Sequence, residues 1–362
     1  MCLKALFSHL KLVVFYRGVI SIHRLFKELL IIAVRGFAHF PATINILITQ
    51  KCNFSCHMCF WSNSDNIDST EKKELNTSQI EKIVHQIKEY KPLIHIGGGE
   101  PFMHQDLSEI VAVIKQNKLK CIITTNGFLM DRKYTDKLIK MNLDILIISL
   151  YGIESVHDQI TGVKHSFKET MKNMKYFLKM RHSTKIFVSI VPLPENIKTI
   201  KQLVGDLSSI GVDAVKIEQL NFLTDQEYNN LANNNGSFNF LPTAFIKEGY
   251  FSQSFAENLA YLYSELSQIY SNFVFIKPYL SRSQLIDWYT TIPRWSKCFF
   301  LTHSLFVNYN GDIVPCQSFS RCVLGNIERN SLKDIWTSEK YKKFRKAVAV
   351  SKPISCVRCC KN

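Results

Sequence analysis

The run Lys51-Cys52-Asn53-Phe54-Ser55-Cys56-His57-Met58-Cys59-Phe60 carries the clearest chemical signal in this chain. Its three cysteines have C-x3-C-x2-C spacing and follow a β-like stretch, Ile44 to Thr49. Three thiolates can bind three irons of a cubane cluster and leave the fourth iron open for reaction, whereas four thiolates close the cluster. The spacing therefore predicts a reactive iron–sulfur centre at Cys52, Cys56 and Cys59. A zinc knuckle or three buried thiols are the alternatives.

A glycine run follows the cysteines after about forty residues, in Ile94-His95-Ile96-Gly97-Gly98-Gly99-Glu100-Pro101. Because glycine has no side chain, it lets backbone amides and carbonyls come close to a ligand. Such a run on its own is more often a tight strand end than a ligand cradle. Because this run follows the three cysteines, we interpret the two motifs together as one signature.

Together the two motifs resemble the signature of radical S-adenosylmethionine (SAM) enzymes. The resemblance implies that the methionyl amine and carboxylate of SAM chelate the open iron, and that Gly97, Gly98, Gly99 and Glu100 meet the methionyl ammonium. It implies reductive cleavage of SAM to a 5′-deoxyadenosyl radical that abstracts hydrogen from a substrate, and a reducing partner such as flavodoxin or ferredoxin. Further cofactor contacts that it implies are Met58, Phe60, Asn126 and Ser149.

Met58 has a second interpretation, and a nearby position, Tyr151, departs from the family. Met58 would lie against the adenine, but a methionine packed in the core is equally consistent with the sequence. Tyr151 stands where many relatives carry Asp, so no catalytic role is inherited there. No acid or base is assigned; the candidates by location are His95, Tyr151, His157, Asp158, Glu218 and His303.

Between Ile44 and Leu220, short β-branched runs alternate with amphipathic stretches, which is typical of repeated βα units around a parallel sheet. The fold class predicted is α/β, a partial (βα)6 TIM-like barrel, in which chemistry gathers at the C-terminal ends of the strands. Helix starts are indicated by capping boxes at Ser78 with Glu81 and Ser166 with Glu169. The predicted strands are Ile44–Thr49, Leu93–Ile96, Lys120–Thr124, Asp144–Ser149, Ile186–Val191 and Ala214–Glu218.

At 362 residues the chain exceeds the roughly 250 to 300 residues at which single cores stop growing, so two units are expected. We predict four segments. A basic amphipathic helical segment covers 1–40, the barrel covers 41–220, a bridge with a helix at Ala256–Ile269 and a loop at Asn229–Asn239 covers 221–297, and a small cysteine-rich domain covers 298–362.

The last segment carries six cysteines, and a strand, an Asn310-Gly311 turn and a second strand separate the first two of them. The segment resembles the auxiliary-cluster region of SPASM and twitch proteins, the twitch-like form with one further [4Fe-4S] cluster fitting better. By that resemblance its ligands are Cys298, Cys316, Cys356 and Cys359, with Cys322 and Cys360 as substitutes. A zinc ribbon is the alternative, because four thiolates also suit zinc.

The composition limits the range of cellular compartments and binding partners to be expected. Eleven cysteines without a secretory signal favour metal binding in a reducing compartment over disulfides, so we expect a cytoplasmic protein. The net charge of +15 is partly concentrated in residues 1–40, where an apolar run is interrupted too often to span a bilayer. That segment is expected either to lie on an anionic membrane face or to pack on the barrel. Nucleic acid is not expected, since no recognition motif accompanies the charge.

The predicted function is hydrogen abstraction from a small-molecule or lipid-linked substrate, in a net oxidation assisted by the auxiliary cluster. Peptide-modifying relatives often carry an N-terminal leader-binding domain, for which residues 1–40 are too short. The alternatives are a RiPP-type peptide-modifying radical SAM maturase and a non-catalytic iron–sulfur electron carrier.

Overall fold

The structure is a computed structural model, and it describes residues 36–59, 73–232, 244–291, 298, 300–350, 353, 356, 358 and 359. The helix predicted at the N-terminus therefore lies almost wholly outside the described residues, and Phe60 and Cys360 lie outside them as well. No helix among the described ranges is long and apolar enough to cross a membrane.

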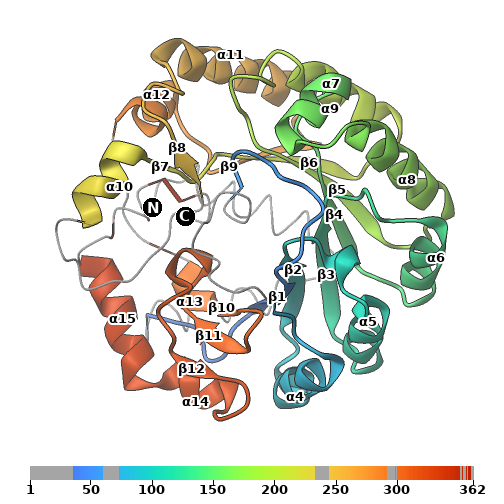
Figure 1. Cartoon of the computed structure of the whole chain (residues 1–362), viewed down its shortest axis with the longest axis vertical. Helices are drawn as coiled ribbons and strands as arrows, with labels where there is room; N and C mark the ends of the chain where they lie inside the picture. The colour runs from blue at the N-terminus through green and yellow to red at the C-terminus, as the bar shows by residue number, and fades with distance from the viewer. Residues whose placement is uncertain are drawn as a thin grey trace.

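A curved ten-stranded sheet forms the centre of the molecule, in the order β12-β11-β10-β1-β2-β3-β4-β5-β6-β9 (Figure 1). All six strands predicted for the barrel are present, and each pairs in parallel with the next. Their bounds are β1 (Thr43–Thr49), β2 (Leu93–Gly98), β3 (Lys120–Thr125), β4 (Ile145–Ser149), β5 (Lys185–Ile190) and β6 (Ala214–Glu218). The predicted α/β partial barrel is thus confirmed.

Two further parallel strands extend this sheet beyond the six predicted. On one side β9 (Val274–Lys277) pairs with β6, and on the other β10 (Ser304–Val307) pairs with β1. From β10 the sheet continues antiparallel through β11 (Asp312–Val314) and β12 (Gly325–Asn326). The predicted hairpin at Asn310-Gly311 is confirmed: Gly311 has φ +77° and donates its N–H to Asn308 O at 2.9 Å. The strands of the C-terminal segment therefore share the barrel's sheet.

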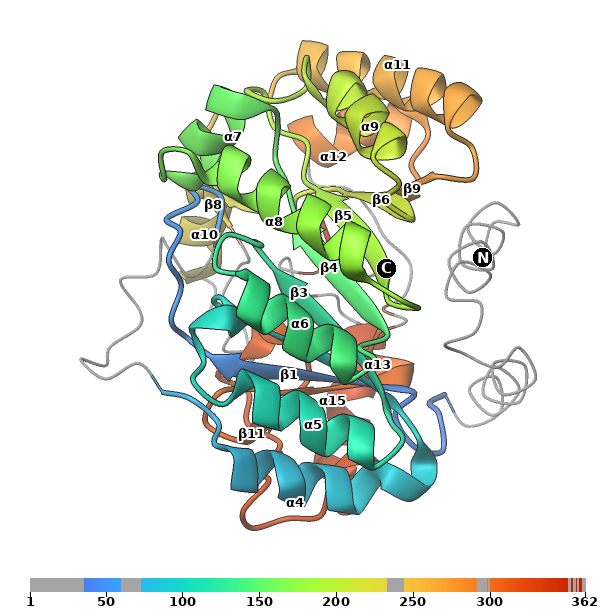
Figure 2. The same ribbon diagram turned by 90° about the vertical axis from the view of Figure 1, so that its right-hand side faces the viewer.

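Helices cover the outer face of this sheet (Figures 1 and 2). Side chains that point outward, such as Ile44, Ile46 and Ile48 of β1, are fully buried against them, while their inward-pointing neighbours stay partly exposed. The helices are α4 (Thr77–Ile87), α5 (Leu107–Gln116), α6 (Arg132–Lys140), α7 (Glu154–Thr161), α8 (Ser166–Met180), α9 (Ile200–Ser209), α10 (Asp225–Ala232), α11 (Gln253–Ile269), α12 (Arg282–Thr290), α13 (Phe300–His303), α14 (Leu332–Thr337) and α15 (Glu339–Val350).

The bridge agrees with the sequence in one helix and differs in its loop. The helix predicted at Ala256–Ile269 is α11. The predicted loop at Asn229–Asn239 is wrong in its first part, because α10 runs to Ala232. Two short strands, β7 (Leu223–Thr224) and β8 (Phe245–Ile246), pair with each other on either side of this part of the chain.

Both predicted capping boxes are wrong, because other side chains reach the free N–H groups first. Asn76 caps α4 and forms a capping box with Gln79, ahead of Ser78. At α8 the cap comes from the preceding helix: the Asp158 carboxylate accepts hydrogen bonds from Ser166 Oγ and Phe167 N, both at 2.9 Å. A carboxylate at a helix start also interacts favourably with the helix dipole.

Candidate functional site

The three cysteines lie in a loop that leaves the C-terminal end of β1, where a barrel places its chemistry. The Cys59 N–H donates to Cys56 O at 2.9 Å and closes a turn within the loop. Burial, followed by the negative charges of Cys59 and Cys52, raises the pKa of the Cys56 thiol. The three sulfurs are therefore near enough to repel one another as thiolates, and bound iron would relieve that repulsion.

The end of β2 fixes the start of this loop. Gly99 N donates to Thr49 O at 2.9 Å, and Glu100 N donates to Lys51 O at 2.7 Å. A Cβ at Gly98, which has φ +143°, would lie 2.4 Å from Thr49 O, and one at Gly99 would lie 2.2 Å from Lys51 O. In the structure these two glycines make room for the backbone of the cysteine loop. Their contact with SAM, and that of Gly97, stays a prediction.

Glu100 connects the ends of two strands instead of pointing to open space. Its side chain is 1% exposed and accepts hydrogen bonds from Thr125 Oγ1 and Asn126 N, both at 2.7 Å, and from Phe102 N at 3.0 Å. Burial nevertheless raises the pKa of this carboxyl to about 7. Both oxygens already accept hydrogen bonds from the protein, so in this structure Glu100 holds together the C-terminal ends of β2 and β3.

The other side of the cysteine loop rests on β3 and α7. Asn126 donates from Nδ2 to Asn53 Oδ1 at 2.8 Å, and Ser55 N donates to Thr161 O at 3.0 Å. The Asn53 Nδ2 group is buried and has no hydrogen-bond partner among the described residues. An unused donor inside the loop is the kind of group that a bound cofactor would satisfy.

Tyr151, two residues after the end of β4, is a further side chain near the cysteines. It makes a side-chain hydrogen bond with Ser149, and burial together with the charges of Cys56, Cys59 and Cys52 raises its pKa. The phenol is therefore near enough to the three sulfurs to be influenced by their charge. His157 stacks on its ring, is 0% exposed and accepts the Tyr151 N–H at Nδ1 (3.1 Å). Burial lowers the His157 pKa to about 4, so this histidine is neutral.

A second polar group near the cysteines was not predicted. Tyr250 of the bridge donates from its hydroxyl to Glu195 Oε2 at 2.6 Å, and the same hydroxyl lies 3.2 Å from His57 Nε2. His57 and Glu195 are partly exposed. No local motif marks this group, because its members come from three distant segments.

The inner face of the barrel is polar towards its C-terminal end. Ser149 and Ser189 stand side by side on β4 and β5, and Ser189 Oγ donates to Glu218 Oε2 at 3.2 Å. Lys216 Nζ lies 2.8 Å from the same carboxylate. Among the other predicted residues, Met58 is 5% exposed within the hydrophobic core, which agrees with its alternative interpretation. His95 Nε2 lies 2.7 Å from Thr124 Oγ1.

The C-terminal cysteines are partly brought together. Cys298 and Cys316 pack against the same apolar group, Phe300, Phe306 and Val314. Burial raises the pKa of the Cys322 thiol, the charge of Lys340 lowers it, and the charge of Cys316 raises it, so Cys322 is within electrostatic influence of Cys316. In the described part of the chain, no three His, Cys, Asp or Glu side chains stand close enough to hold a single metal ion.

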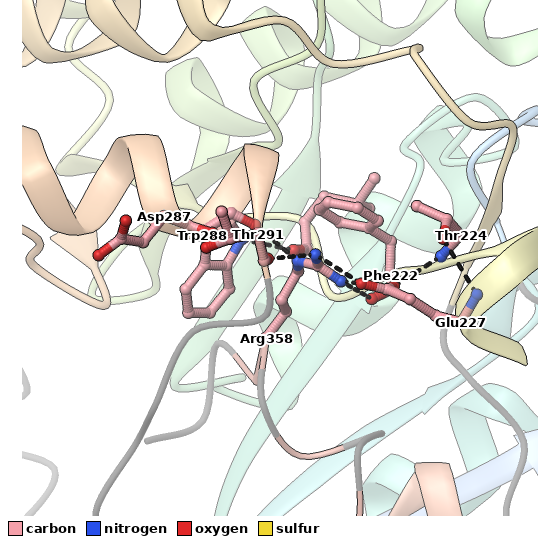
Figure 3. A network of polar contacts seen from close by, with 8 residues as sticks. Phe222, Thr224, Glu227, Asp287, Trp288, Thr291 and Arg358 are labelled. Carbon is pink, nitrogen blue, oxygen red and sulfur yellow. Dashed lines mark hydrogen bonds and ion pairs between the residues drawn. The ribbon is translucent and has the colours of Figure 1, made fainter. Parts of the chain in front are cut away.

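Arg358, between Cys356 and Cys359, attaches the last cysteines to the bridge (Figure 3). It is 2% exposed and makes a bidentate pair with Glu227 at 2.7 and 2.9 Å. It also donates to the carbonyls of Trp288 (2.6 Å) and Thr291 (2.5 Å). Glu227 caps its own helix through Thr224 N at 2.9 Å. One buried cation therefore joins α10, α12 and the end of the chain.

Two family models match this chain: the radical SAM superfamily over residues 46–207, and the SPASM iron–sulfur cluster-binding domain over residues 298–361. The first covers β1 through α9 with the cysteine loop, and the second covers the C-terminal cysteines. The chain belongs to the radical SAM superfamily and carries a C-terminal SPASM domain. It is accordingly an enzyme, and its cofactors are SAM, a SAM-binding [4Fe-4S] cluster and an auxiliary iron–sulfur cluster.

One similar curated protein is the tungsten-containing aldehyde ferredoxin oxidoreductase cofactor-modifying protein of Pyrococcus furiosus. It is 26% identical over 323 residues, which are 82% of this chain and 81% of that protein. Among solved structures, SuiB of Streptococcus suis bound to SAM superposes with a TM-score of 0.66 at 18% identity, over 92% of this chain and 74% of SuiB. SuiB bound to its precursor peptide SuiA gives 0.65 at 19% identity, over 88% and 70%.

Proposed function

We propose that this enzyme abstracts hydrogen from a substrate held at the C-terminal end of the barrel, in a net oxidation that the auxiliary cluster assists. The observation that carries the proposal is the loop of Cys52, Cys56 and Cys59 at the C-terminal end of β1, beside a polar inner face and close enough to Tyr151 for its thiols to influence the phenol. When bound and reduced, the cluster at these cysteines supplies the electron that cleaves SAM to a 5′-deoxyadenosyl radical.

The protein's own part in this reaction is to hold the reacting groups in position and to exclude water. The end of β2 and the pair Asn53–Asn126 hold the cysteine loop, and Ser149 and Tyr151 bring polar groups to its inner side. The group His57–Tyr250–Glu195 stands at the same edge and offers a partly exposed carboxylate. By resemblance, Cys298, Cys316, Cys356 and Cys359 bind the auxiliary cluster. A flavodoxin or ferredoxin would supply electrons.

For the substrate we favour a small molecule, lipid-linked or free. The Pyrococcus furiosus relative, which matches along 82% of this chain, is named as a cofactor-modifying protein, which supports this class. A peptide is the alternative, since SuiB binds its precursor peptide and has the same fold.

The first test is anaerobic reconstitution with iron and sulfide, followed by dithionite and SAM. We expect 5′-deoxyadenosine to form, and Cys56→Ala to abolish it. Cys121→Ala is the matched control, because Cys121 is also buried (0% exposed, against 8% for Cys56) but lies on the helix side of β3. Loaded clusters without 5′-deoxyadenosine would favour the electron-carrier alternative.

The second test identifies the substrate class. A deuterated cell extract is separated into lipid, small-molecule and peptide fractions, and each is added to the loaded enzyme with unlabelled SAM. Because hydrogen moves from the substrate to the 5′-carbon, deuterium in 5′-deoxyadenosine marks the fraction that holds the substrate. Label from the peptide fraction alone would replace our proposal with the maturase alternative.

A further inference from the structure

The hydroxyl of Tyr341 is a buried donor that nothing in the preceding mechanism uses. Tyr341 is on α15 and is 0% exposed. Its hydroxyl has no hydrogen-bond partner of acceptable geometry within the described part of the chain. A buried hydroxyl without an acceptor is costly, so it is found mainly where an unseen group accepts its hydrogen.

The surroundings of this hydroxyl are the segments that carry two of the C-terminal cysteines. On the same helix, Lys340 Nζ donates to Val323 O at 2.6 Å and Phe344 lies edge-on to Phe319, with centroids 5.1 Å apart. Phe319 N in turn donates to Cys316 O at 3.0 Å. Tyr341, which follows Lys340 and lies one helical turn before Phe344, is therefore on the part of α15 that packs against the segment beginning at Cys316.

Arg345 closes the opposite side of the tyrosine and cannot take its hydrogen. Its guanidinium carbon lies 3.7 Å from the centroid of the Tyr341 ring, and its Nε donates to Leu301 O at 3.0 Å, near Cys298. Guanidinium groups have no acceptor. Arg345 can only donate to the phenol oxygen, which leaves the phenol hydrogen for another acceptor. Burial raises the pKa of Tyr341, the charge of Arg345 lowers it, and the charges of Cys316 and Cys298 raise it further, which agrees with the packing of α15 against the segments of these two cysteines.

We propose that the Tyr341 hydroxyl donates a hydrogen bond to a cysteine sulfur of the auxiliary cluster, at Cys298 or Cys316, and thereby raises the cluster's reduction potential. The inference rests on the proposed function, which assigns these two cysteines as ligands. Hydrogen bonds to the sulfurs are among the features that set the potential of a cluster, because they stabilise the electron added on reduction. The effect is strengthened where water is excluded. Tyr341 thus acts on electron transfer through the reduction potential of the cluster.

The test is Tyr341→Phe in the full-length chain, in a background where Cys52, Cys56 and Cys59 are alanine so that only the auxiliary cluster is observed. The measurement is the midpoint potential, from a redox titration followed by electron paramagnetic resonance. We expect unchanged iron and sulfide and a shift to lower potential. Tyr263→Phe is the control, since the Tyr263 oxygen accepts from Gln219 Nε2 at 2.7 Å and no C-terminal cysteine influences it.

A second measurement does not depend on the variant keeping its cluster. In the background protein with Tyr341 intact, hyperfine spectra of the reduced cluster in H2O and D2O should show one exchangeable, strongly coupled proton. Equal potentials for Tyr341→Phe and its parent, or no such proton, would overturn the hydrogen bond while leaving the proposed function intact. A background protein without any iron would instead remove the auxiliary cluster itself.

Discussion

Replacing Gly99 with alanine should dislodge the cysteine loop without unfolding the chain. The new Cβ would lie 2.2 Å from Lys51 O, 2.7 Å from Lys51 C and 2.9 Å from Gln50 O, all of which are backbone atoms. Ordinary contact begins at 3.4 Å, so the backbone at Lys51 must withdraw by about 1.2 Å, the difference between 3.4 and 2.2. That movement also breaks the hydrogen bond from Glu100 N to Lys51 O, which is 2.7 Å long.

Cys52 is the next residue along the chain, and it takes part of the displacement. Overpacking of this kind typically costs about 1–3 kcal/mol, which leaves a folded protein. Misplacing a reacting group by about 1 Å can, however, lower a rate by about 100-fold. We therefore expect a small fall in the urea midpoint, a clear loss of iron at the N-terminal site and at least about 100-fold slower formation of 5′-deoxyadenosine.

The matched control is Gly97→Ala, compared by iron content. Its Cβ would meet only Leu47 Cδ2, at an ordinary 3.8 Å, and should leave the cysteine loop in place. Iron and sulfide are measured per chain after anaerobic reconstitution of both variants and the unmutated protein. If Gly99→Ala binds as much iron as Gly97→Ala, the loop does not depend on this close approach and the reasoning fails.

Two further predictions concern buried charges. The folded pKa of Glu100, about 7, is above the ordinary value of 4.5 for a glutamate, so its contribution to stability is greatest below pH 4.5 and is lost as the pH rises to about 7, by about 3 kcal/mol. Urea unfolding across this range should show that slope in the unmutated protein and not in Glu100→Gln; parallel curves would contradict it. Arg358→Met should cost about 3 kcal/mol by leaving the largely enclosed Glu227, whose side chain is 13% exposed, without its partner, and adding Glu227→Met should recover most of the loss. Additive losses in the double variant would show that the pair does not act as a unit.

Much of the barrel could be predicted because its signal is local. Strands such as Ile145–Ser149 and Ala214–Glu218 are short runs rich in β-branched and aliphatic residues, and the cysteine spacing fixes its own chemistry. Pairing between distant segments leaves no such signal. The four residues of β9 are too few to distinguish from a loop end, and nothing near Ser304 indicates that β10 lies beside β1.

The same reasoning explains which site residues were missed. The hydrogen bonds of Glu100 to Thr125 and Asn126 could not be predicted, because these partners follow the neighbouring strand and only the register of β2 against β3 brings them together, while the predicted contact of Glu100 with SAM stays a prediction. Arg358 is a single basic residue between two cysteines, and its partner Glu227 is 131 positions away. The predicted capping box at α8 was wrong for a related reason, since the carboxylate that caps this helix, Asp158, lies on another helix.

Strand β1 has β2 on one side and β10 on the other, and its end carries the reactive cysteines. The backbone that presents the first cluster is consequently hydrogen-bonded along its flank to a segment that belongs to the second. Any evolutionary exchange of the C-terminal module must bring a replacement edge whose register fits Thr43 to Ile46. Successful chimaeras should therefore be cut after α12, so that the incoming piece includes its own first strand.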